Sequence, residues 1–159
     1  AVWRGPGHLL YEAMARERDE PHRTFFILVP YFTTLAGGLA ANILFGPFAL
    51  AGYLVAGLGD AIGEPVGARF GRHRYRVPSR SSVPATRSFE GSAAVLLMSA
   101  IALALAAAAT PHIVPGPFGL FKILAIAAIA ALTEAVSPHG WDNATMQVVP
   151  SALAWLWLV

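Results

Sequence analysis

The sequence predicts an all-α fold, a polytopic bundle of about five transmembrane helices, and two observations carry that prediction. Hydrophobic residues make up 56% of the 159 residues and charged residues only 13%, whereas about a quarter of the residues in a soluble domain are charged. From Thr24 to Gly59 the chain carries no charged side chain. A soluble core needs neither feature, so a membrane protein explains both.

The uncharged stretch is longer than one membrane span of about 20 residues and suits two spans joined by a tight turn. Asparagine, glycine and proline cluster at residues 42–47, which places the turn there. Three more apolar stretches follow the polar middle of the chain. The expected spans are residues 25–41, 48–62, 91–109, 118–136 and 144–159, within a single transmembrane domain, 24–159, that has polar loops at 63–90 and 137–143.

The N-terminal residues 1–23 form an amphipathic segment, in which Tyr11–Glu20 is typical of a short helix that ends before Pro21. This segment and the 63–90 loop both carry several arginines, and the positive-inside rule places them in the cytoplasm. Two further spans bring the 137–143 loop to the same side. We therefore expect an integral membrane protein, of a bacterial or archaeal cell membrane or of an organelle membrane, whose active face is cytoplasmic.

Several classes of chemistry are excluded by composition. The chain has no cysteine, so disulfide bonds, thiolate metal sites and cysteine nucleophiles are absent. The basic loop has few aromatic side chains for base stacking, so no nucleic-acid partner is expected. The chain begins with alanine and ends inside an apolar run, and we expect it to be part of a longer protein.

Glycine stands at every fourth position from Gly59 to Gly71, which on a helix forms one smooth stripe. Small residues four apart let another helix approach closely, so the stripe can also support a homo-oligomer or a larger membrane complex. Pro65 removes a backbone hydrogen bond and predicts a kink or a restart of the helix. A broken helix at membrane depth is normally tolerated only beside a cavity or packed protein.

Asp60 and Glu64 lie one helical turn apart at the end of the second expected span. Carboxylates at that depth are costly unless they are paired or bind a cation. One interpretation pairs them with Arg69 or Arg72. The other is a metal site for Mg²⁺, which commonly takes one or two carboxylates together with substrate phosphates.

The basic side chains that follow fit the recognition of a polyphosphate, since guanidinium groups bind phosphate oxygens in a bidentate manner. The first candidates in this run are Arg69, Arg72, His73 and Arg87. For Arg74, Arg76 and Arg80, contact with anionic lipid headgroups is an equal explanation.

Further candidates stand near helix ends. Ser88 can cap the third span and Glu90 complements its dipole, which for Glu90 is as good an explanation as a catalytic role. Glu134 is an ionisable residue in an otherwise apolar helix, and such residues are functional candidates by default. Asn143 is a candidate N-cap of the last span, and His139 is typical of a loop residue rather than a ligand.

Three blocks of residues together resemble a known family. Their order and spacing are similar to those of the phytol kinases and dolichol kinases, a family of membrane polyprenol kinases, and the first two blocks also look like the phosphatidate cytidylyltransferases. The resemblance covers about residues 45–155. The blocks are Gly59-Asp60 with Gly67, Phe70-Gly71 and His73, then Ser88-x-Glu90-Gly91, then Glu134-Ala135 with Asp142-Asn143.

The sequence differs from the family pattern at two kinds of position. Arg87 and Arg72 stand where the family commonly has lysine, and an arginine keeps the charge without being equivalent to a lysine. The loop Tyr75–Thr86 is also longer than in short relatives.

The resemblance implies a lipid kinase that transfers a phosphoryl group from CTP, or less often ATP, to the hydroxyl of an isoprenoid alcohol such as phytol, geranylgeraniol or dolichol, with Mg²⁺. On this hypothesis Asp60, with Glu64, binds the metal, and Asp142 or Glu134 accepts the proton of the lipid alcohol. The catalytic candidates are Asp60, Glu90, Glu134 and Asp142, and the nucleotide-binding candidates are Arg69, Arg72, His73, Arg87, Ser88 and Asn143.

Other functions stay open at this point. A cytidylyltransferase acting on a lipid phosphate forms a CDP-lipid and pyrophosphate, whereas a kinase forms a lipid monophosphate and CDP. A non-catalytic subunit of a membrane assembly would use the glycine stripe for packing alone. A transporter is less favoured, because the sequence shows no inverted repeat.

Overall fold

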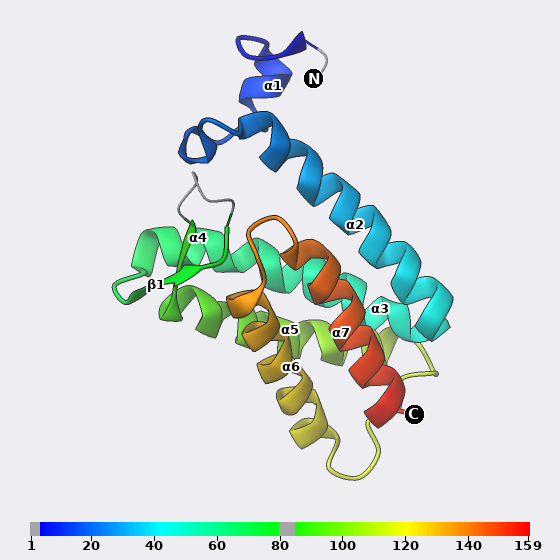
Figure 1. Ribbon diagram of the computed structural model, residues 1–159. Coiled ribbons are helices and arrows are strands. Elements are labelled where there is room, and N and C mark those ends of the chain that lie inside the picture. The colour runs from blue at the N-terminus through cyan, green and yellow to red at the C-terminus, as the bar shows by residue number, and fades with distance from the viewer. Residues whose placement is uncertain (1–3, 80–84) are drawn as a thin grey trace.

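The computed structural model describes residues 4–79 and 85–159, and helices dominate it (Figure 1). One small antiparallel hairpin interrupts the helices and pairs Arg74 with Ser88. A π-helical segment, Val55–Asp60, joins α3 to α4. The elements are α1 (Leu9–Glu12), α2 (Arg23–Phe45), α3 (Ala49–Leu54), α4 (Ala61–Phe70), β1 (Arg74–Val77), β2 (Ala85–Ser88), α5 (Phe89–Ala109), α6 (Gly119–Val136) and α7 (Asp142–Trp157).

Three helical stretches of the described chain are long and apolar enough to cross a membrane: Arg23–Phe70, Phe89–Ala109 and Gly119–Val136. Large apolar side chains on their outer faces are exposed, as expected where a protein meets lipid; Leu35 is 69% exposed and Leu97 is 65% exposed. The prediction of apolar membrane helices is confirmed at this level. The count of five spans is not confirmed: the first stretch takes up two of the expected spans, and α7, with 16 residues, is not among the three.

The predicted turn, 42–47, starts several residues before the observed one. Helix α2 continues to Phe45, and the reversal falls at Gly46, whose φ of 53° favours glycine. Asn42 lies inside the helix, where its side-chain amide donates to the carbonyl of Gly38 at 3.3 Å and to the hydroxyl of Tyr53. These bonds satisfy the polar group, so asparagine does not end the helix.

The predicted polar loop 63–90 is largely regular structure. Helix α4 takes up its first part, to Phe70, and the hairpin β1–β2 its second part, so the all-α prediction missed a small sheet. In β1 the Val77 side chain is buried while the neighbouring arginines are exposed. The irregularity expected at Pro65 lies upstream, in the π-helical segment, and the helix continues through the proline. Such π-helical turns are frequent at functional sites.

The N-terminal segment does not form the single helix predicted for Tyr11–Glu20, and α1 packs against the start of α2 instead. Helix α1 stops at Glu12, and Tyr11 is buried with its hydroxyl 2.9 Å from the Thr24 hydroxyl. The Gly7 backbone N–H, at 2.8 Å, and the Arg23 guanidinium hold the pKa of Glu12 below its usual value. Tertiary contacts therefore override the local helical pattern.

The glycine stripe packs against α5, which confirms the predicted close helix approach. A Cβ added to Gly59 would lie 2.6 Å from the Ser99 hydroxyl, and one added to Gly63 would lie 2.7 Å from Val95. The stripe is therefore covered by the same chain. An oligomer or larger complex through this stripe is not supported, because α5 of the same chain and its cap residue pack on Gly59, Gly63 and Gly67 in the described structure.

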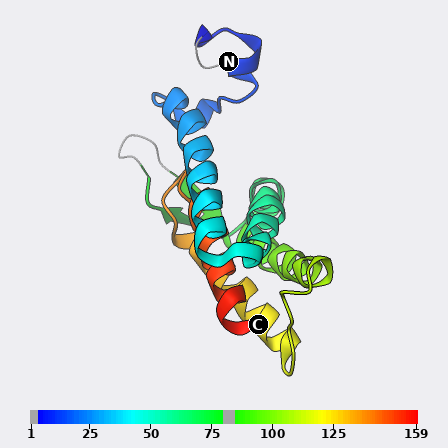
Figure 2. The ribbon, with the colours of Figure 1, turned by 90° about the vertical axis from the view of Figure 1, so that its right-hand side faces the viewer.

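The three polar segments meet at one end of the molecule (Figures 1 and 2). The His139 backbone N–H donates to the Pro78 carbonyl at 2.9 Å, and Nε2 of His139 lies 3.2 Å from Oδ1 of Asp19 in the N-terminal segment. At the other end, the Val114 N–H donates to the Leu158 carbonyl at 2.7 Å. The three segments therefore lie together, which is the part of the expected arrangement that the structure shows.

Replacing Gly91 by alanine tests the packing of α4 on α5. The new Cβ would lie 2.8 Å from the Gly63 carbonyl oxygen and 3.3 Å from the Gly67 Cα, and backbone atoms cannot move aside cheaply. We expect Gly91→Ala to destabilise the protein by about 1–3 kcal/mol, measured as a lower melting temperature in detergent. The matched control is Gly57→Ala, whose Cβ would meet no described atom within 4 Å. Equal melting temperatures for both variants would contradict the close packing.

Candidate active site at the polar end of the bundle

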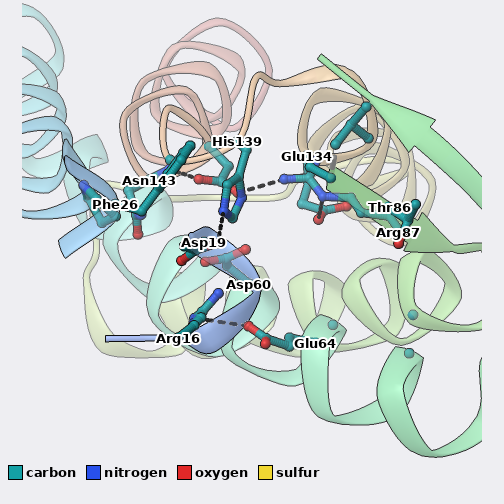
Figure 3. Close-up of a pocket in the computed structure, with 18 of the residues that line it drawn as sticks. Arg16, Asp19, Phe26, Asp60, Glu64, Thr86, Arg87, Glu134, His139 and Asn143 are labelled. Carbon is teal, nitrogen blue, oxygen red and sulfur yellow. Dashed lines mark hydrogen bonds and ion pairs between the residues drawn. The ribbon is translucent and has the colours of Figure 1, made fainter. Parts of the chain in front are cut away.

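A cavity of about 620 Å³ lies where the polar segments meet (Figure 3). Its walls come from the N-terminal segment, α2, the end of the π-helical segment, α4, the hairpin, the start of α5 and the 134–143 region. The structure thus gathers elements from most of the chain around one polar space. Seven predicted site residues line it: Asp60, Glu64, Arg87, Ser88, Glu134, Asp142 and Asn143.

Arg87 connects the parts of this site. Its Nε lies 2.7 Å from Oε1 of Glu134, and its Nη2 lies 2.6 Å from Oδ2 of Asp142. The side chains are 14%, 9% and 13% exposed, respectively. Buried charges are costly unless paired in good geometry, so the guanidinium and the two carboxylates stabilise one another. This arrangement places Arg87 as a buried clamp rather than as an open phosphate contact.

The clamp leaves one acceptor atom unused. Oδ2 of Asp142 accepts from Arg87, and its Oδ1 accepts from the Asn143 backbone N–H at 3.1 Å. Oε1 of Glu134 pairs with Arg87, but Oε2 of Glu134 is buried and has no hydrogen-bond partner in the described part of the chain. A buried polar atom without a partner is rare and is found at functional sites.

Asp60 lies at the end of the π-helical segment, within electrostatic reach of Arg87, Asp142, Arg16 and Glu64 (Figure 3). Among residues 4–79 and 85–159 there is no group of three or more side chains that alone could hold a metal ion. Mg²⁺ needs only one or two carboxylates when substrate phosphates complete its shell. The Asp60 carboxylate, on the cavity wall, fits that requirement.

Glu64 has a different partner from those expected. Its carboxylate lies 2.9 Å from the Arg16 guanidinium, so neither Arg69 nor Arg72 is the counter-ion that the sequence interpretation proposed. The Arg69 guanidinium lies over the Phe70 ring, 5.4 Å from its centroid. The pairing needs a residue from the far N-terminal segment, which helical spacing does not reveal.

Four predicted site residues lie away from the residues that line the cavity. Arg69 and Arg72 are exposed near the end of α4. Glu90, at the start of α5, is paired with His73: its carboxylate lies 2.8 Å from the His73 ring. Arg80 falls outside the described residues.

Two predicted helix caps have different outcomes. The Ser88 hydroxyl accepts from the Gly91 N–H at 3.1 Å, so Ser88 caps α5 as predicted. Asn143 is not a cap, because α7 begins one residue earlier and Trp141 takes the cap position.

Sequence reasoning missed the contribution of the N-terminal segment. Arg16 and Asp19 line the cavity, and Oδ1 of Asp19 lies 3.2 Å from Nε2 of His139. Asp19 is 4% exposed and the His139 ring packs on Phe26 with 4.6 Å between centroids. The only signal was an amphipathic pattern, which identifies a packed face but not its partner.

No family model, curated protein or solved structure matches this chain. The chemistry of the cavity is therefore the basis for a functional proposal: an arginine clamp, an acceptor without a hydrogen bond in the described chain, and a carboxylate beside them.

Arg87→Gln tests the clamp. Removing the guanidinium leaves the Glu134 and Asp142 carboxylates buried without a cation, and we expect a loss of about 3–5 kcal/mol of stability. Thermal unfolding in detergent measures it, and adding Glu134→Gln to this variant should recover part of the loss. Arg76→Gln, an exposed change in the same hairpin, is the control. A melting temperature for Arg87→Gln equal to that of the control would show that the clamp is unimportant.

His139→Ala tests the attachment of the N-terminal segment. Without the imidazole, Asp19 loses its buried partner, so we expect faster hydrogen exchange across residues 9–22 while α5 and α6 keep their protection. His112→Ala, an exposed change at the opposite end, should leave exchange in residues 9–22 unaltered. Unaltered exchange in both variants would mean that other contacts hold the segment.

Proposed function

We propose that the protein is an integral membrane kinase that transfers a phosphoryl group from CTP or ATP to the hydroxyl of an isoprenoid alcohol such as phytol, geranylgeraniol or dolichol. The observation that supports this most directly is Oε2 of Glu134, a buried carboxylate oxygen without a hydrogen bond in the described chain, on a residue that lines the polar cavity. A substrate hydroxyl in the cavity would supply the donor that this atom lacks, once the Glu134 side chain turns to expose Oε2.

The lining of the cavity suits both the apolar tail and the polar hydroxyl of such an alcohol. Ile27 and Pro30 of α2, with Gly63 and Gly67 of α4, contribute apolar lining beside the charged residues. An isoprenoid tail could remain in the bilayer while its hydroxyl reaches the polar end. Withdrawing such a tail from the bilayer into water costs about 0.8 kcal/mol per CH₂. This cost favours an enzyme that is embedded in the membrane and acts on the alcohol there.

In the proposed reaction the alcohol oxygen attacks the terminal phosphorus of the nucleotide, and its proton passes to Oε2 of Glu134. The bond between that phosphorus and the bridging oxygen breaks, and the nucleoside diphosphate leaves with the electron pair. Positioning and charge neutralisation account for most of the catalysis in phosphoryl transfer. Bound Mg²⁺ would neutralise phosphate charge, and Asp60 is the residue that would hold it.

Glu134 is a better candidate for the base than Asp142. Both oxygens of Asp142 already accept hydrogen bonds, one from Arg87 and one from the Asn143 backbone. Asp142 therefore acts as a positioning residue that holds Arg87 against Glu134. Ser88 supports the same geometry by capping α5 next to Arg87.

In this proposal α2, the α3–α4 stretch, α5, α6 and α7 cross the membrane, and the polar end faces the cytoplasm. The clustering of arginine in the N-terminal segment and around the hairpin supports that orientation. A cytoplasmic cavity would also have direct access to nucleotide.

The reaction is tested by incubating the purified protein with Mg²⁺, labelled CTP or ATP, and phytol, geranylgeraniol or longer polyprenols. We expect a lipid monophosphate and a nucleoside diphosphate, and no product when Mg²⁺ is chelated. A CDP-lipid with pyrophosphate would instead indicate a cytidylyltransferase. Absence of transfer to any lipid would support a structural subunit.

Glu134→Gln tests the proposed base. Glutamine can still accept from Arg87 but cannot take a proton, so we expect kcat to fall by about 10²–10⁴-fold with KM for the nucleotide little changed. Asp142→Asn removes the same charge from the same clamp and should cost less in kcat. Melting temperatures of both variants control for folding, and an equal loss in kcat at equal stability would argue against Glu134 as the base.

A further inference from the structure

The arginines on the cavity wall differ in how firmly they are held. Among the described residues, three arginines line the cavity: Arg16, Arg74 and Arg87. Arg87 is 14% exposed and pairs with two carboxylates that are 9% and 13% exposed. Moving it would leave both negative charges without a cation in a largely buried place. The other two arginines carry no such constraint, and they come from separate elements, the N-terminal segment and β1.

Arg16 is held by an exchangeable contact. Its ion pair with Glu64 is 2.9 Å long, but the two side chains are 50% and 46% exposed. An ion pair that faces water contributes little to stability, so a phosphate with more charge can replace the carboxylate. The backbone near Arg16 is nevertheless anchored, because Asp19, three residues later and 4% exposed, contacts His139.

Arg74 is on the cavity wall without a competing partner. It is exposed, and its side chain forms no hydrogen bond or ion pair with residues 4–79 or 85–159. Its backbone is fixed by the hairpin, where Arg74 lies opposite Ser88. A guanidinium held at a rigid position beside a polar cavity suits bidentate binding of phosphate oxygens.

We propose that Arg16 and Arg74 are the polyphosphate-binding residues of this cavity, and that Glu64 is the counter-ion that holds Arg16 until phosphate replaces it. The inference rests on the proposed use of a nucleoside triphosphate. It transfers to Arg16 and Arg74 the role that sequence reasoning gave to Arg69 and Arg72, which do not line the cavity. It also gives Glu64 a role other than metal binding.

The two roles of Glu64 predict opposite changes in polyphosphate affinity when Glu64 is replaced by glutamine. If Glu64 competes with phosphate for Arg16, Glu64→Gln frees the guanidinium and removes a negative charge from the cavity, so polyphosphate binding tightens. If Glu64 holds Mg²⁺, the same change weakens binding of the magnesium complex. A single substitution of similar shape therefore separates the two roles.

The test uses the full chain in neutral detergent without added lipid, with magnesium tripolyphosphate as the probe and calorimetry as the readout. We expect Arg16→Gln and Arg74→Gln each to raise Kd about tenfold or more, and Glu64→Gln to lower it. Arg76→Gln is the matched control, because Arg76 is exposed on the same strand as Arg74 but is not among the cavity-lining residues. Melting temperatures confirm that the variants fold.

The outcomes separate this inference from the proposed reaction. Equal Kd for Arg16→Gln, Arg74→Gln and Arg76→Gln would overturn it, as would no binding by the native chain, weaker binding after Glu64→Gln, or a dominant effect of Arg69→Gln or Arg72→Gln. Lipid phosphorylation is measured separately. Tripolyphosphate binding that depends on Arg16 and Arg74, without any lipid product, would support this inference and contradict the kinase.

Discussion

The guanidinium of Arg87 is the contact on which the polar end of the molecule depends. It belongs to β2, and its two carboxylate partners come from the end of α6 and the start of α7. Because all three side chains are largely removed from water, at 14% exposed or less, each charge requires the others. The clamp fixes the hairpin against the helices, and the hairpin in turn fixes the start of α5 through the Ser88 cap. This contact therefore holds the hairpin, α6 and α7 in the positions from which they line the cavity.

The same clamp gives the site its chemistry. The guanidinium binds one oxygen of each carboxylate. The second oxygen of Asp142 accepts from the Asn143 backbone N–H, whereas the second oxygen of Glu134 has no hydrogen bond within the described chain. The remaining oxygen is the atom on which the kinase proposal depends. Asp60 stands close enough to interact with the clamp but is not part of it. Structural and reactive roles are thus divided among neighbouring carboxylates by their hydrogen bonds.

Close packing of small residues brings the helices that carry these groups together. The glycines of α4 admit α5 to backbone contact, and alanines such as Ala102, Ala127 and Ala130 fill the interior. Between apolar helices in lipid, such packing is a main source of association. The glycine stripe therefore serves the fold of a single chain, and the π-helical segment beside it places Asp60 at the edge of the cavity.

The sequence by itself determined the membrane class, most helix positions, the close approach along the glycine stripe, the Ser88 cap and the shared end of the polar segments. These properties follow from composition, local periodicity and charge counts. Only the tertiary structure decided the hairpin, the end of α2 beyond Asn42, the partners of Arg87 and Glu64, and the place of Arg16 and Asp19 in the cavity. Partner choice depends on distances between segments far apart in the chain, and helical spacing carries no information about those distances.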